Sequence, residues 1–298
     1  RFGEAVRELY DCLVLFECKL TIDDAGFGQV VRYLQNLCVK KSACAILFDR
    51  KSFWLINSNQ AFVQKVVTSK WINKGSKSLF QNFILANKSP WISRLKDACT
   101  SLGVNVVEGA SFLGRGAFGC VFKVERSVDK EFFALKVVEK NSIERLYNES
   151  YALREAEDTK LTIRCIGEVT EIPNGAALLL SPVGTPLPLP TTTSEVTSLF
   201  ELLWKLHEKG LVHGDPRVPN VIVNGKELLW IDLVELFQAS PALRSWDAEI
   251  LARNILKIPS DFPLYNNLIK PIEDYGKSAS RENLTHLIAK VCLKLGFE

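Results

Sequence analysis

Polar residues in the second half of the chain recur at spacings that suit the transfer of a phosphate group. Asp215 lies five residues before Asn220, and Asp232 follows at the end of a short predicted hairpin. Mg²⁺ prefers oxygen ligands and shares its coordination with phosphates. We therefore expect Asn220 and Asp232 to bind Mg²⁺ or Mn²⁺, and Asp215 to orient the attacking hydroxyl group and accept its proton. Arg217 is placed to neutralise the transferring phosphate, and His213 is expected to pack beneath this segment as a structural residue.

A glycine-rich turn precedes these residues in the chain. Gly114, Gly116 and Gly119 form a GxGxxG pattern that runs into the strand-like stretch Cys120–Val124. Glycine lets backbone amides approach phosphates without a clash from Cβ. In dinucleotide-binding folds the same pattern leads from a strand into a helix. Here it leads from strand to strand, which favours a turn that covers the phosphates of ATP, with a plain hairpin as the alternative.

A lysine and a glutamate complete the predicted phosphate site. Lys136 lies seventeen residues after Gly119 on a predicted third strand, where its ammonium group can reach the α- and β-phosphates of ATP. A glutamate on the following helix should pair with this lysine. We expect this residue to be Glu149, because an apolar pair follows it in the predicted helix, and Glu155 is the alternative at a longer spacing.

The pattern of elements predicts an α+β fold with two lobes, preceded by a smaller α/β domain. The Pro-, Gly- and Thr-rich stretch Pro182–Thr193 fits neither a helix interior nor a central strand, and it is expected to link the lobes. Backbone groups near Ser181 and Val183 are then expected to bind the adenine ring. The expected small domain, first lobe and second lobe span residues 1–103, 104–187 and 188–298. Expected elements of the first lobe are the strands Val106–Phe112, Cys120–Glu125 and Glu131–Val138 and the helix Ser142–Ala156.

Composition narrows the class of protein. Hydrophobic residues make up 47% of the 298 residues and charged residues 24%, as in an ordinary globular protein. A net charge of +3 without a run of like charges does not indicate a nucleic-acid or membrane surface, and the longest apolar runs are too short to span a bilayer. The eight cysteines form no CxxC pair, which is typical of reduced thiols. The chain begins at Arg1 and has no Met, so we expect a trimmed chain.

The run from His213 to Asn220 (HGDPRVPN), with Trp230-Ile-Asp232 after it, resembles the catalytic segments of the protein-kinase-like superfamily. More narrowly, it looks like the kinase domains of the Crinkler effectors of oomycetes and fungi, over residues 105–298. The resemblance implies a two-lobed kinase fold that uses ATP and Mg²⁺ (or Mn²⁺) and phosphorylates a protein substrate on Ser or Thr. It also implies a secreted virulence effector that acts in host cells, commonly in the nucleus. Autophosphorylation is also expected, because Ser and Thr are plentiful near the predicted linker.

Several positions depart from ordinary protein kinases. Gly214 replaces the usual Arg, and Leu233 and Val234 follow Asp232 in place of Phe and Gly. The segment from Asp232 to the next predicted helix near Ser245 is very short and contains no APE-like motif. These departures keep two alternatives open. One is a pseudokinase that binds ATP without transferring phosphate, and the other is a small-molecule acceptor, as in the aminoglycoside and choline kinases that share the pattern.

The first hundred residues support a second hypothesis. Glu17 and Lys19 end a predicted strand as an ExK pattern, and a QxxxY pattern that begins at Gln29 opens a helix. Together they resemble PD-(D/E)xK nucleases, which have a restriction-endonuclease-like fold. A metal site would need a further acid, for which Glu4 and Asp11 are the candidates. We expect a degenerate or accessory nuclease-like domain, with an active metal-dependent nuclease as the alternative, and contact with nucleic acid only here.

Overall fold

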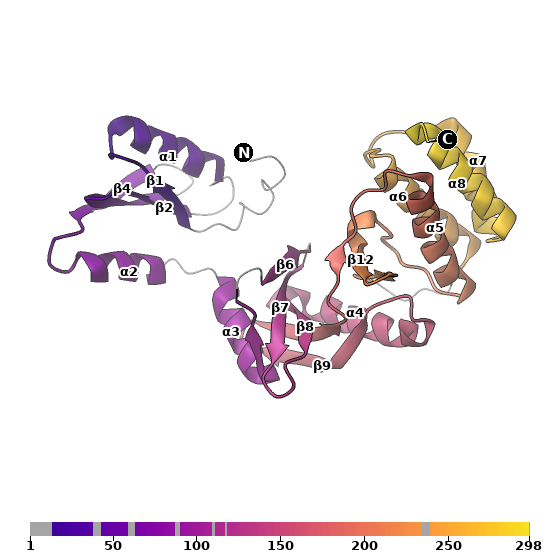
Figure 1. The fold of residues 1–298 in the computed structure, drawn as a ribbon, viewed down its shortest axis with the longest axis horizontal. Helices are drawn as coiled ribbons and strands as arrows, with labels where there is room; N and C mark the ends of the chain where they lie inside the picture. Colours follow the sequence, from indigo (N-terminus) through magenta and orange to yellow (C-terminus); the bar gives the residue numbers. More distant parts are fainter. Residues whose placement is uncertain are drawn as a thin grey trace. The chain divides into compact units, whose positions relative to one another are not determined.

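The computed structural model describes residues 14–37, 43–58, 63–86, 90–108, 111–116, 118–233 and 239–297. The chain forms two compact units, Arg1–Leu95 and Lys96–Glu298, which are described separately below (Figure 1). The division falls within helix α3 (Pro90–Leu102). The expected boundaries after residues 103 and 187 stay predictions.

The first unit is built on a four-stranded sheet with the order β1-β2-β3-β4. Strand β1 pairs with β2 in parallel, and β2, β3 and β4 pair in antiparallel fashion. A parallel pair needs a crossover connection, which helix α1 provides; one face of the sheet packs against α1 through Val30 and Leu34. Helix α2 contributes Phe80 and Phe83 to the cluster around Phe53. The bounds are β1 Val14–Cys18, α1 Asp24–Leu37, β2 Ala43–Phe48, β3 Ser52–Ser58, β4 Val63–Lys70 and α2 Ser76–Ala86.

The second unit begins with an antiparallel sheet in the order β5-β7-β8-β10-β9, with β6 paired to β7. Helix α4 (Ile143–Ala156) packs beside this sheet (Figure 1) and buries Leu146, Ala152 and Leu153. The strands are β5 Val104–Val106, β6 Phe112–Arg115, β7 Gly119–Arg126, β8 Phe132–Glu139, β9 Arg164–Ile172 and β10 Gly175–Ser181. The expected single strand Val106–Phe112 is wrong, because β5 and β6 pair separately with different parts of β7.

Helices form the rest of the second unit. They are accompanied by a small sheet of β11, β12 and β13, in which β11 precedes the first helix of this part of the chain and β12 and β13 follow that helix. A capping box between Thr192 and Glu195 fixes the start of the first of these helices. The elements are β11 Thr185–Pro186, α5 Thr193–Glu208, β12 Val221–Asn224, β13 Glu227–Trp230, α6 Pro241–Ile255, α7 Asn266–Lys277 and α8 Arg281–Leu295. The predicted α+β class and two-lobed architecture are therefore confirmed. Among the described helices, none combines the length and apolarity needed to cross a membrane.

The sheet lobe and the helical lobe of the second unit are joined at two places. The chain passes from β10 to β11 through residues 182–184, where Gly184 lies so close to β12 that a Cβ atom would be 2.7 Å from Val223 O. The second junction lies before β9, where Trp230 N donates to Leu161 O (2.9 Å) and Ile163 N donates to Trp230 O (3.1 Å). One hydrophobic core continues through both lobes, from Leu146 of α4 to the helices.

A glycine sets the close packing of α6 against α7. A Cβ atom at Gly276 would lie 1.8 Å from Ser245 Oγ and 2.6 Å from Pro241 O, so the substitution Gly276→Ala must push the helices apart. We expect it to lower the free energy of unfolding by about 1–3 kcal/mol, measured by urea denaturation. The control is Gly28→Ala in α1, where a Cβ would meet nothing within 4 Å. Equal midpoints for the two variants would contradict this packing.

Candidate functional site

Lys136 lies at the centre of the sheet of the second unit and forms a buried ion-pair network. Its strand β8 pairs with β7 at Val121 and with β10 at Leu178. The Nζ atom lies 2.7 Å from Oε2 of Glu149 on α4 and also donates a hydrogen bond to Asp232. A buried ammonium group without partners costs several kcal/mol, so these two carboxylates are what permits a lysine at this position.

The charges of this network follow from burial and pairing. Burial alone lowers the pKa of Lys136, but the carboxylates of Glu149 and Asp232 outweigh it and hold that pKa above its usual value. Burial raises the pKa of Glu149, and the lysine opposes the rise. For Asp232 the effect of burial is outweighed by Lys136, so its pKa is lowered. Asp232 is therefore a carboxylate at neutral pH, as a ligand for a hard cation must be.

The structure places the two glutamates that the sequence left open in different environments. Glu149 is only 7% exposed and faces the sheet with Leu146 and Leu153. Glu155 is exposed to solvent. The helical spacing therefore brings Glu149, and not Glu155, to the lysine.

The catalytic segment predicted from sequence folds into a tight loop that brings three of its polar residues together. Asn220 Nδ2 donates to the backbone oxygen of Asp215 (2.9 Å) and to its Oδ2 (3.2 Å). Arg217 pairs with the same Oδ2 atom from an exposed position. Because the amide nitrogen of Asn220 is used to hold Asp215, its Oδ1 is the atom that suits a metal ion.

Hydrogen bonds through Ile231 attach Asp232 to the catalytic segment. Ile231 N donates to Asn220 O (2.9 Å), and Ile231 O lies 3.1 Å from His213 Nε2. The Asp215 N–H donates to His213 Nδ1 (3.3 Å), so Nε2 carries the proton and donates to Ile231. Burial lowers the pKa of His213. The neutral ring therefore has a structural role, because it connects Asp215 to Ile231. Asp232 adopts a φ of 57°, an uncommon backbone conformation for a non-glycine residue that clusters at functional sites.

A buried aspartate that the sequence analysis did not single out anchors the catalytic segment from below. Asp247 on α6 is 1% exposed and accepts from His213 N (2.7 Å) and Gly214 N (3.0 Å). His207 Nε2 lies 3.2 Å from it, and His207 Nδ1 lies 2.8 Å from the Tyr275 hydroxyl. One sequence signal was available: Asp247 is an acid on the apolar face of a helix, beside Ala248, Leu251 and Ile255.

The glycine-rich turn lies close to Asp232. Gly116 N donates to Gly119 O (2.9 Å) and closes the turn, and a Cβ at Gly116 would lie 3.9 Å from Asp232 Oδ2. At Gly119 a Cβ would lie 2.5 Å from Val137 O, so only glycine allows β7 to approach β8 here. Gly114 lies on β6 opposite Val121. The turn is thus held above the ion-pair network, where phosphates are expected.

The two residues predicted to contact adenine lie at the junction of the lobes. Ser181 is the last residue of β10 and is buried, and Val183 is half-buried in the segment that leads to β11. Their place in the fold is the one expected from the sequence, and their role stays a prediction.

The donor set suits a metal ion that is shared with phosphates. No group of three or more His, Cys, Asp and Glu residues within the described ranges could hold a metal by itself. Asn220 and Asp232 offer two oxygen ligands from segments joined through Ile231. Mg²⁺ commonly takes one or two protein ligands and completes its shell with water and phosphate oxygens, so these residues fit it.

In the first unit, three of the five predicted nuclease residues come together. Lys19 Nζ lies 2.8 Å from Glu17 Oε1 and donates to Gln29 Oε1 (2.6 Å). The hydrogen bond with Glu17 raises the pKa of Lys19. The other two candidates, Glu4 and Asp11, lie outside the described residues.

No known protein family and no curated protein matches this sequence. The solved structures similar to it include that of the Cydia pomonella granulovirus kinase, PK-1, with a TM-score of 0.47 and 12% identity over 66% of this chain and 99% of that one. Another is Rad53 1-466 in complex with AMP-PNP, with a TM-score of 0.46 and 14% identity over 78% of this chain and 71% of that one. The second unit has two lobes, with its buried Lys136–Glu149 pair in the sheet lobe and the loop that carries Asp215 and Asn220 in the helical lobe.

Removing the anchor of the catalytic segment should destabilise the second unit. The substitution Asp247→Ala leaves His207 and the backbone N–H groups of His213 and the half-buried Gly214 without their acceptor, and each such loss at a buried group costs about 1–3 kcal/mol. We expect the free energy of unfolding to fall by about 3 kcal/mol or more, measured by urea denaturation. Asp261→Ala, at an exposed loop position, should change it little. A small effect of Asp247→Ala would contradict the anchoring role.

Proposed function

We propose that the second unit is an ATP-dependent phosphotransferase, an atypical Ser/Thr protein kinase that also phosphorylates itself. One observation carries the proposal: the ion-pair network of Lys136, Glu149 and Asp232 is connected through Ile231 to the loop that holds Asp215 and Asn220. Groups that suit phosphate binding, metal binding and proton transfer are therefore assembled by one continuous set of contacts.

Each residue has a role that follows from its position. The Lys136 ammonium group holds the α- and β-phosphates, and the turn with Gly114, Gly116 and Gly119 covers them. Backbone groups at Ser181 and Val183 bind the adenine ring. Asn220 and Asp232 would hold Mg²⁺, which neutralises charge on the phosphates when bound. These interactions lower the barrier mainly by positioning and by charge compensation.

Asp215 acts on the acceptor. Its carboxylate orients the substrate hydroxyl group and takes its proton as the oxygen forms a bond to the γ-phosphorus. The bond from the γ-phosphorus to the bridging oxygen of ADP breaks in the same transfer. Asn220 holds the Asp215 side chain in place (3.2 Å), and Arg217 is close enough to stabilise charge on the moving phosphoryl group.

The test is incorporation of radiolabelled phosphate from ATP and Mg²⁺ by the purified chain. We expect label in the wild type, at least about a hundredfold less in Asp215→Ala and Lys136→Ala, and none when EDTA removes the metal. The matched controls are Asp261→Ala and Lys205→Ala, both at exposed positions, which should label as the wild type does. Equal labelling by the Asp215 variant would refute the proposed role of this residue.

The same experiment separates a kinase from a pseudokinase. The Leu233 and Val234 that follow Asp232 support the pseudokinase alternative. A pseudokinase would be stabilised against heat by ATP and Mg²⁺ and yet incorporate no label into itself, into protein or into small-molecule acceptors. ATP-induced stabilisation together with label that depends on Asp215 supports the enzyme.

A second candidate function, metal-dependent cleavage of nucleic acid, belongs to the first unit. The contacts of Lys19 with Glu17 and Gln29 favour it, because a lysine beside a carboxylate at a strand end is the arrangement that the resemblance implies. The purified chain with Mg²⁺ or Mn²⁺ should then nick plasmid DNA. Lys19→Ala should abolish nicking, and Lys77→Ala, exposed on α2, should not. Absence of nicking by the wild type would favour a degenerate or accessory domain.

A further inference from the structure

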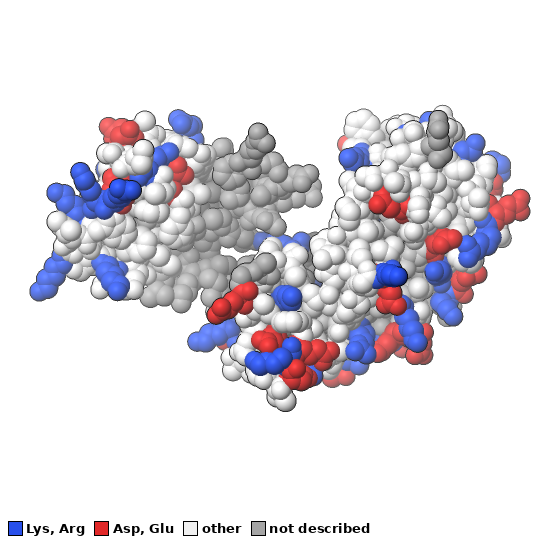
Figure 2. Space-filling model, viewed as in Figure 1, with Lys and Arg blue, Asp and Glu red and all other residues white. Residues whose placement is uncertain are grey.

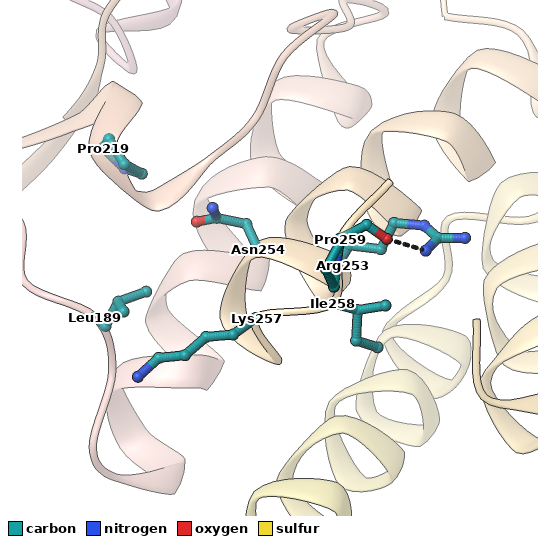
Figure 3. A pocket seen from close by; sticks show the side chains of 7 residues that line it. All are labelled: Leu189, Pro219, Arg253, Asn254, Lys257, Ile258 and Pro259. Atoms are coloured by element: carbon teal, nitrogen blue, oxygen red, sulfur yellow. Dashed lines mark hydrogen bonds between the residues drawn. The ribbon is translucent and has the colours of Figure 1, made fainter. Parts of the chain in front are cut away.

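An open pocket lies beside the catalytic loop of the second unit. Its volume is about 370 Å³, and Figure 3 shows the side chains that line it. They come from the segment before α5, from the catalytic loop, and from the end of α6 and the turn after it. The lining residues are Leu189, Pro219, Arg253, Asn254, Lys257, Ile258 and Pro259.

The pocket is fixed directly to the residues proposed to act on the acceptor. Pro219 immediately precedes Asn220, and Asn254 Oδ1 accepts a hydrogen bond from Val218 N (2.9 Å). Figure 3 shows Asn254 extending toward the side of the pocket where Pro219 lies. Since Pro219 is four residues from Asp215, the two lie within about 14 Å of each other, which is the span of about four residues of extended chain.

The lining is apolar with an excess of positive charge. Leu189, Ile258 and the two prolines supply apolar surface, and the charged lining residues are both cations. Arg253 is occupied within the fold, because its Nε bonds Glu249 Oε1 (2.7 Å) and its Nη1 bonds Phe262 O (2.8 Å). Its role is to hold the turn after α6.

Lys257 differs from this arginine. It is exposed, and Figure 3 shows its side chain extending toward Leu189, across the pocket. Across the ranges that the structure describes, no carboxylate forms an ion pair with its Nζ. A single cation beside apolar surface is complementary to a ligand with an apolar group next to an acidic one.

We propose that this pocket binds the substrate protein beside its phosphorylated Ser or Thr, with an apolar side chain against Leu189 and Pro219 and an Asp or Glu paired with Lys257. The assignment rests on the proposed phosphotransferase function and specifies its substrate class. Leu189, Pro219, Lys257 and Pro259 are all exposed, so the pocket opens to solvent along its rim. An open site suits an extended peptide segment, whereas small molecules are usually held in clefts that bury most of their surface.

The test uses an arrayed library of Ser/Thr peptides in which one position at a time is fixed, phosphorylated by the full chain with radiolabelled ATP. We expect wild type to favour Asp or Glu over Lys or Arg by about fivefold or more at one position within about four residues of the acceptor. Lys257→Glu should reverse that preference. Lys205→Glu, the same charge change at an exposed position on α5, should leave it as in the wild type. Stabilisation of both variants by ATP and Mg²⁺ establishes that they are folded.

Each other outcome overturns the assignment in a recognisable way. An acidic preference that Lys257→Glu does not change, or the absence of any positional preference, would place recognition elsewhere and leave the proposed kinase activity intact. Autophosphorylation without phosphorylation of any peptide would exclude a peptide as the occupant. Absence of both labels would remove the proposed function and the assignment with it.

Discussion

The second unit depends on the burial of one positive charge. A lysine at the centre of a sheet is tolerated only when carboxylates compensate its charge, and Lys136 is paired with one carboxylate from the next helix and one from a distant part of the chain. Glu149 must come from α4, which fixes the rotation of that helix against the sheet. Asp232 must come from the segment after β13, which fixes the position of that segment of the helical lobe relative to the sheet. The same electrostatic requirement that stabilises the fold therefore assembles a site with the charges that a nucleotide and its metal need.

A second buried charge plays the corresponding part in the helical lobe. Asp247 accepts hydrogen bonds from the backbone of His213 and Gly214, and His207 lies within hydrogen-bonding distance of its carboxylate. His213 in turn connects to Ile231, next to Asp232. The two networks thus meet at the short segment of Ile231 and Asp232. The loop from His213 to Asn220 is therefore held by polar contacts with α6 and, through this segment, with the sheet lobe. Side chains on this loop are therefore already held in position for the proposed transfer of phosphate.

The features that depend on spacing along the chain could be predicted from the sequence. The glycine pattern, and the helical spacing that brings Glu149 to Lys136, depend on neighbours along the chain. Sequence reasoning missed Asp247 and the pocket around Lys257, because their partners are more than thirty residues away and only the tertiary fold joins them. It also joined β5 and β6 into one strand, because an apolar stretch does not show where pairing changes. Secretion and action in host nuclei follow from resemblance alone and stay predictions.

The two junctions between the lobes have a mechanical consequence. A rigid body attached at two separated points rotates most easily about the line that joins them, and two such points here are the segment at Gly184 and the contact of Trp230 with Leu161 and Ile163. Twisting and sliding of the sheet lobe over the helices are thereby resisted. Rotation about that line would carry the glycine turn toward or away from Asp232, and the Lys136–Asp232 ion pair and the core shared by the two lobes oppose it.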